Sequence, residues 1–194
     1  MLDDKTVVSL ERWGEAFSKA LVDQQLIGTI GAAWEAPLLM DTMAGTANDG
    51  QWAVAQIPDF GAGALTGPDG GSGVAVMKGC AFPEQAMEFN NWFNTQIDDL
   101  VSQGLVVAAR GDVKTPEALQ KFYGGQDIYG ELATANANMT ADFGYMPFFS
   151  AVGAQMMEAA AAAGSGSGSV ADVFTVAQDT SVQVLKDNGL PVAE

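Results

Sequence analysis

The spacing of apolar residues predicts a chain built mainly from helices. Near its start, Leu10, Trp13, Phe17 and Leu21 recur every three to four residues, which predicts one amphipathic helix over Asp4–Gln24. The same spacing or suitable end residues predict further helices at Pro37–Ala44, Pro83–Leu100, in a short segment after Thr115, at Ile128–Met139, at Pro147–Ala163 and from Ser169 to Gly189.

Particular residues define the ends and faces of these helices. Pro83 suits a first helical position, where its missing N–H has no partner to lose, and Thr115 is predicted to be an N-cap. Ser169 with Asp172 is typical of a capped N-terminus, and the GSGSGS run at 164–169 before it predicts a flexible linker. The faces expected to be buried are Ala86, Phe89, Phe93, Ile97 and Leu100, then Phe148, Val152, Met156 and Ala159, then Val170, Phe174, Ala177, Ser181 and Leu185.

Three short segments have the composition of strands. Gly28–Ala33 is a run of small and β-branched residues, and Trp52–Ile57 alternates large apolar residues with smaller ones. Gly73–Met77 follows a glycine-rich loop at Asp59–Gly73. The expected fold class is therefore α/β, with a small sheet flanked by helices and a helix-rich C-terminal half.

The length and hydropathy fit a globular protein. The 194 residues suffice for one domain or two small lobes. The longest apolar runs are interrupted by polar residues or consist mostly of alanine, so no membrane span is predicted. No charged leader with an apolar core follows Met1, so we expect either a cytosolic protein or a mature form that lacks its signal peptide.

The charge balance is strongly acidic. Asp and Glu total 24 against 8 Lys and Arg, for a formal net charge of −16. A field of that sign repels a phosphate backbone and an anionic lipid surface, so nucleic acid and such membranes are disfavoured as partners. The acids are scattered, which is typical of a solvated surface that keeps a protein soluble.

Several kinds of reactive chemistry are missing from the sequence. It contains no histidine, which excludes Ser-His and Cys-His pairs and most zinc sites. Cys80 is the sole cysteine and is expected to be a small buried hydrophobe. The glycine-rich run GPDGGSG at 67–73 lacks the lysine of a P-loop and leads into a predicted strand. We therefore predict no catalytic residue, no metal site and no cofactor.

A series of motifs follows one order over most of the chain. The motifs are LVDQQLI, IGAAW, GQWAVAQIPDF, GGSGVAV, PEQAMEFNNWF, TPEALQKF, YMPFFSAV and SVADVFTVAQDTSVQVL. This succession resembles the C-terminal half of the family-1 solute-binding proteins, the maltose-binding-protein-like sugar receptors of ABC importers. The resemblance implies a type II lobe of the periplasmic-binding-protein kind and a small-molecule carbohydrate as ligand. It also implies an importer permease as the partner of the full receptor, in an extracellular, periplasmic or cell-surface location.

The resemblance implies ligand-binding roles for particular residues. A sugar's C–H face packs on an aromatic ring, while its hydroxyls need hydrogen-bond partners when they leave water. The matching residues are Trp34 as a stacking platform, Glu35 as a hydroxyl acceptor, Gly71 and Ser72 in a hinge turn, and Tyr145, Phe148 and Phe149 in an aromatic cluster. The residue patterns alone leave Trp34 open to a core role and Gly71 to a turn role. Of the adjacent phenylalanines, one is expected in the core and the other at the ligand.

The resemblance covers only part of the family's fold. The first strands and helices of the N-terminal lobe have no counterpart, so the face of Phe89, Phe93 and Ile97 needs another partner. That partner could be this lobe itself, a second copy of the chain or a separate polypeptide. We expect a single partial receptor, with C-terminal-lobe elements at 1–70, a hinge-crossing strand and helix at 71–104, and a helical part at 105–194.

Two main functional hypotheses follow. The leading one is non-catalytic carbohydrate binding as the solute receptor of an ABC importer, with half of the cleft in this chain. The alternative is a truncated or engineered interaction module that forms a homodimer or pairs with another chain, such as the missing N-terminal lobe, without binding sugar. A third, a carboxylate-based glycoside hydrolase, would need two facing acids about 5–10 Å apart, and the sequence identifies none.

Overall fold

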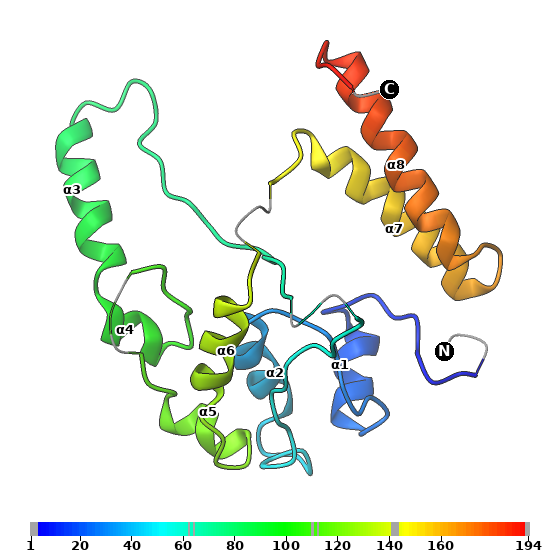
Figure 1. Ribbon diagram of the computed structural model, residues 1–194. Coiled ribbons are helices and arrows are strands. Elements are labelled where there is room, and N and C mark those ends of the chain that lie inside the picture. The colour runs from blue at the N-terminus through cyan, green and yellow to red at the C-terminus, as the bar shows by residue number, and fades with distance from the viewer. Residues whose placement is uncertain are drawn as a thin grey trace. The chain divides into compact units, whose positions relative to one another are not determined.

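The described chain is helical and forms two compact units. The computed structural model describes residues 4–61, 63, 65–109, 111, 113–140 and 144–192. One unit comprises residues 15–141, and the other comprises residues 1–14 and 142–194. Every regular element in the described ranges is a helix (Figure 1). Across these ranges, no helix is both long and apolar enough to cross a lipid bilayer.

The unit at 15–141 has one apolar core. Its described helices are α1 (Glu15–Val22), α2 (Glu35–Met43), α3 (Pro83–Asn94), α4 (Ile97–Ser102), α5 (Glu117–Phe122) and α6 (Ile128–Ala137). The side chains of Leu21, Met43, Leu119 and Ile128 are completely or almost completely buried in this core. Figure 1 shows α1, α2, α5 and α6 gathered side by side, so the core is enclosed by helices distant in sequence.

The first helix is shorter than its apolar pattern predicted. The prediction of a helix from Asp4 was wrong, because α1 begins only at Glu15. Trp13 has a φ of 65°, in the left-handed region that interrupts a right-handed helix, and Gly14 follows it. Leu10 and Trp13 are partly exposed and belong to the other unit, so their spacing reflects no continuous helical face.

The predicted small sheet is not confirmed. The described residues contain one isolated parallel bridge, between Thr66 and Met139, and no strand. The segment around Val54 is instead held by a side chain. The Gln126 side-chain amide donates to the Val54 carbonyl and accepts from the Val54 N–H, both at 2.8 Å. One amide thus provides the two hydrogen bonds that a neighbouring strand would supply.

The helix predicted from Pro83 is divided, and its predicted buried face is confirmed at Leu100 but wrong for Phe89 and Phe93. α3 ends at Asn94, and α4 begins at Ile97. α4 contributes buried Leu100 to the unit, whereas no residue of α3 is buried. Figure 1 shows why: α3 stands apart from the core helices and is reached by a long extended segment. Cys80, on that segment, is exposed, so the prediction that it is buried was also wrong.

The second unit is built around a helical hairpin. α7 (Phe149–Ser165) and α8 (Val170–Asp187) pack along each other (Figure 1). The predicted inner face of α7 is confirmed at Val152, which is buried. On α8 the prediction was wrong for Val170 and Phe174, which are exposed, whereas Ala177, Ser181 and Leu185 of the predicted face are half-buried.

A capping box starts α8. The Ser169 hydroxyl accepts from the Asp172 N–H at 3.3 Å, and the Asp172 carboxylate accepts from the Ser169 N–H at 2.7 Å. These two hydrogen bonds lower the pKa of Asp172. The predicted cap is therefore confirmed. The predicted flexible linker at 164–169 is wrong, because its first two residues belong to α7 and the rest form a tight turn through Gly166, whose φ is 79°.

Candidate functional site

Trp34 lies directly before α2 and is held by a hydrogen bond across the chain. Its side chain is 40% exposed, and its Nε1 donates to the backbone carbonyl of Asp69 at 3.1 Å. This bond fixes the indole against the glycine-rich turn that contains Gly71 and Ser72, both of them exposed. Three of the predicted site residues therefore lie in one region, around an aromatic ring that is fixed yet partly open to solvent.

The close approach of this turn to Trp34 depends on Gly70. Gly70 and Gly71 have φ values of 91° and 103°, a conformation that favours glycine. A Cβ on Gly70 would lie 3.2 Å from Trp34 Nε1, whereas a Cβ on Gly71 would meet nothing within 4 Å. Sequence reasoning identified Gly71 and missed Gly70. The double glycine signalled a turn, but only the fold shows which glycine touches the indole.

Glu35 follows Trp34 in the chain but is buried. Its side chain is 2% exposed, and Oε1 accepts from the N–H of Ala32 at 3.2 Å, while the Glu35 N–H donates to the Ala32 carbonyl at 3.0 Å. This reciprocal pair closes the start of α2 in the manner of a capping box. The carboxylate also lies where a Cβ on Gly31 would stand. Its expected role as an acceptor for sugar hydroxyls stays a prediction.

Tyr123 links the core to the first turn of α2. Its hydroxyl donates to the carbonyl of Ala36 at 2.9 Å, and its side chain is buried. Burial, and secondarily the negative charge of Glu35, raise the pKa of Tyr123 well above its usual value. Sequence analysis did not single out Tyr123, because a tyrosine that follows a short helix has no local signal for a buried hydroxyl.

The raised pKa of Tyr123 predicts sensitivity to alkali. The folded state favours the neutral phenol, so its contribution to stability is complete below the unfolded pKa of about 10 and is lost as the pH rises above that value. We expect Tyr123→Phe to destabilise the protein at pH 7 by about 1 kcal/mol through the lost hydrogen bond. We also expect the variant to lose less stability than the wild type between neutral and strongly alkaline pH. Urea unfolding over that range tests this, and parallel pH profiles would contradict it.

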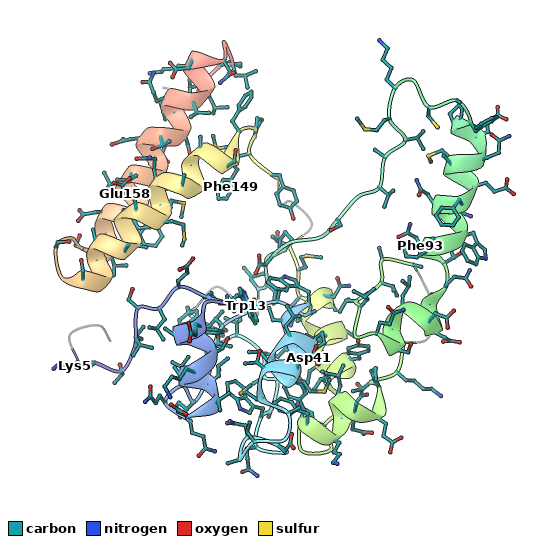
Figure 2. All side chains as sticks on the ribbon, turned by 180° about the vertical axis from the view of Figure 1, so that it is seen from behind. Lys5, Trp13, Asp41, Phe93, Phe149 and Glu158 are labelled. Carbon is teal, nitrogen blue, oxygen red and sulfur yellow. The ribbon has the colours of Figure 1, made fainter. Side chains whose placement is uncertain are left out.

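The other predicted residues, Tyr145, Phe148 and Phe149, belong to the second unit. All are exposed, so the expectation that one of the phenylalanines lies in the core was wrong. Phe148 precedes α7 with a φ of 61°, which is uncommon for a bulky residue and signals local strain. Figure 2 shows Phe149 at the first turn of α7. This left-handed entry leaves both aromatic rings on the surface of the helix start.

The site offers the groups needed for recognition of a neutral polar ligand. Around Trp34 it combines an aromatic face, backbone amides in a glycine turn and the Ser72 hydroxyl. Within the described ranges, no three His, Cys, Asp or Glu side chains are grouped so that they could hold a metal ion. Aromatic faces beside hydrogen-bonding groups match the amphipathic surface of a sugar ring.

Comparison with solved structures shows that the chain is similar to a sugar-binding protein of an ABC transporter. One matching structure is "The galacto-N-biose-/lacto-N-biose I-binding protein (GL-BP) of the ABC transporter from Bifidobacterium longum in complex with lacto-N-biose". The identity is 55% and the TM-score 0.92, over 99% of this chain and 48% of that chain. No protein-family profile and no curated protein sequence matches.

The chain thus spans about half the length of the protein that it matches. The resemblance to an ABC-transporter sugar receptor predicted from the motifs is confirmed, and so is the expectation that the chain corresponds to only part of such a receptor.

Proposed function

We propose that this chain contributes to non-catalytic carbohydrate binding, as part of the solute receptor of an ABC importer. The proposal is supported by 55% identity to a protein whose structure was solved in complex with lacto-N-biose. On this proposal the ligand is an oligosaccharide of the lacto-N-biose or galacto-N-biose kind. The partner of the complete receptor is the importer permease, on the extracellular or periplasmic side of the membrane. A neutral sugar also suits a chain of net charge −16, which would repel an anionic ligand.

The observation that carries the proposal is the fixed indole of Trp34. Its hydrogen bond to Asp69 restrains the ring before any ligand arrives, so little conformational entropy remains to be lost on stacking. A sugar C–H face would pack on the exposed part of the ring. Ser72 and the amides of the glycine turn would then bond the hydroxyls. The Glu35 carboxylate is proposed to accept from a further hydroxyl of the sugar.

The aromatic group of the second unit is proposed as a separate sugar contact. Tyr145, Phe148 and Phe149 expose three rings, and strained backbone such as that of Phe148 concentrates at ligand sites. Exposed aromatic side chains are costly in water. Three of them at a strained helix start therefore favour a role in contacting a ligand over a role in packing.

Substitution of Trp34 tests the proposal. We expect Trp34→Ala to weaken binding of lacto-N-biose by about tenfold or more, a loss of at least about 1.4 kcal/mol. Trp34→Phe retains a stacking ring but loses the bond to Asp69, so we expect an intermediate loss. Calorimetric titrations would use the 194-residue chain and a chimera that joins it to the part of GL-BP outside the match. Phe174→Ala, which removes an exposed ring from α8, is the control and should bind like the wild type.

Two results would overturn the proposal. One is an absence of binding of either lacto-N-biose or galacto-N-biose to the chain and to a chimera that circular dichroism shows to be folded. The other is hydrolysis of the sugar during the titration, detected by chromatography, which would favour the glycosidase hypothesis instead. Equal losses of sugar affinity in Trp34→Ala and Phe174→Ala would show that Trp34 is not the ring on which the sugar stacks.

A further inference from the structure

The last turn of α8 ends in an asparagine that is followed by a glycine. Asn188 is the C-cap of α8, and Gly189 follows it with a φ of 69°, a conformation that favours glycine. Both residues are exposed, and Figure 1 shows this turn at the end of the hairpin, near the C-terminus. Asn188 is the only asparagine of the sequence that precedes a glycine. The pair therefore lies at a helix end, where local opening is easiest.

An asparagine before a glycine is prone to deamidation, one reason why asparagine is thermolabile. The backbone nitrogen of the following residue attacks the side-chain Cγ, and the bond from Cγ to the side-chain NH₂ breaks. Ammonia leaves with the proton of the attacking nitrogen, and a cyclic imide remains. Water then opens the imide at either carbonyl, which gives aspartate or isoaspartate. Such an attack is fast only when the two atoms can approach closely, and glycine, which has no Cβ, hinders the approach least.

The folded helix holds both reacting groups of this pair away from each other. The side-chain Nδ2 of Asn188 donates to the carbonyl of Val184 at 2.9 Å, so the amide is directed back along α8. The N–H of Gly189 donates to the carbonyl of Lys186 at 3.0 Å. Each group must leave its partner before the Gly189 nitrogen can attack Cγ. The reaction therefore requires the last turn of α8 to open.

We propose that Asn188 is a site of spontaneous deamidation and that opening of the last turn of α8 controls its rate. The product places a carboxylate at a helix C-terminus, where the helix dipole disfavours negative charge. It also lacks the N–H that donates to Val184. Isoaspartate adds a methylene to the main chain, which shifts the N–H of Leu190 relative to its acceptor, the Leu185 carbonyl at 2.9 Å. Deamidation thus converts a closed helix end into a frayed one.

Two other asparagines at helix ends provide matched controls. Asn94 is the last residue of α3, and its Nδ2 donates to the carbonyl four residues earlier at 2.8 Å, but the β-branched Thr95 follows it. Asn138 is the C-cap of α6, and its φ and ψ of −86° and 0° are close to the −98° and 11° of Asn188, but Met139 follows it. Both asparagines therefore share features of the helix end with Asn188 but lack the glycine.

Ageing of the 194-residue chain at mildly alkaline pH tests this proposal. Trypsin cleavage after Lys186 releases the peptide 187–194, and liquid chromatography with mass spectrometry separates its asparagine, aspartate and isoaspartate forms. We expect deamidation of Asn188 well before that of Asn94 or Asn138. Unfolding in guanidinium chloride should accelerate the reaction at Asn188 by about fivefold or more, the effect of one typical hydrogen bond on an opening equilibrium.

A pair of glycine variants separates the chemistry of the site from general effects of substitution. Gly189→Ala adds a Cβ beside the attacking nitrogen, so its deamidation in guanidinium chloride should be slower than that of the wild type. Gly45→Ala is the control, because Gly45 has a similar φ of 74° and a Cβ at either glycine would meet nothing within 4 Å. This variant should deamidate at Asn188 like the wild type.

The product can also be examined directly. Asn188→Asp mimics one product and should show faster amide hydrogen exchange at Gly189 and Leu190 than the wild type. The proposal is overturned if Asn188 reacts no faster than Asn94 and Asn138, or if unfolding leaves its rate unchanged. Equal rates in Gly189→Ala and Gly45→Ala, or unchanged hydrogen exchange in Asn188→Asp, would also contradict it. None of these readouts depends on sugar binding.

Discussion

Ile128→Ala is expected to lower the free energy of unfolding by about 2–5 kcal/mol. Ile128 starts α6 and is completely buried in the core shared by α1, α2, α4 and α5. Removing three carbons from this position loses transfer free energy and leaves a cavity that rigid helices refill only in part. A loss of this size is a large part of the stability of a small unit, so the midpoint of urea unfolding should fall clearly.

The chain provides a matched control for this experiment. Ile27 is 99% exposed, so Ile27→Ala removes the same atoms without opening a cavity. We expect its effect to remain within about 0.5 kcal/mol. Urea unfolding followed by circular dichroism compares the two variants directly. Similar losses in both would show that Ile128 does not occupy the core described above.

Gly31→Ala is expected to destabilise the protein by about 1–3 kcal/mol, because the added Cβ displaces a buried, hydrogen-bonded side chain. A Cβ at this position would overlap the carboxylate of Glu35, which is buried and bonded to the Ala32 N–H. The Glu35 side chain would have to move and give up that bond, and the loss of a hydrogen bond by a buried polar group is costly. Because Glu35 adjoins Trp34, we also expect weaker sugar binding in the chimera.

Two further substitutions test the cause of this loss. Gly28→Ala changes a glycine of the same segment whose Cβ would meet nothing within 4 Å, and it should be close to neutral. The double variant G31A/E35A has no carboxylate for the new Cβ to overlap. It should therefore lose less stability than Gly31→Ala and Glu35→Ala do when their separate losses are added. The overlap with Glu35 is not the cause if the double variant loses as much stability as the two single variants together. The same holds if Gly28→Ala and Gly31→Ala lose equal stability.

Local sequence patterns predicted those features that depend on residues a few positions apart. The capping box of Ser169 and Asp172 joins residues three positions apart, and the helical spacing around Val152 covers successive turns of α7. Both predictions were confirmed, because each pattern forms the interaction within its own segment. The pattern around Trp13 failed, since one left-handed residue interrupts the helix without altering the spacing of apolar side chains.

The sequence by itself predicted a chain that is mostly helical and acidic and that resembles part of an ABC-transporter sugar receptor. Only the tertiary structure decided which predicted residues are accessible. The hydrogen bond from Trp34 to Asp69 joins residues 35 positions apart, and the amide pair of Gln126 and Val54 spans 72 positions. The same applies to α3, where an apolar stripe predicted burial but Phe89 and Phe93 are exposed. A stripe shows that a helix has a face to cover, while only the folded chain shows whether a covering surface is present.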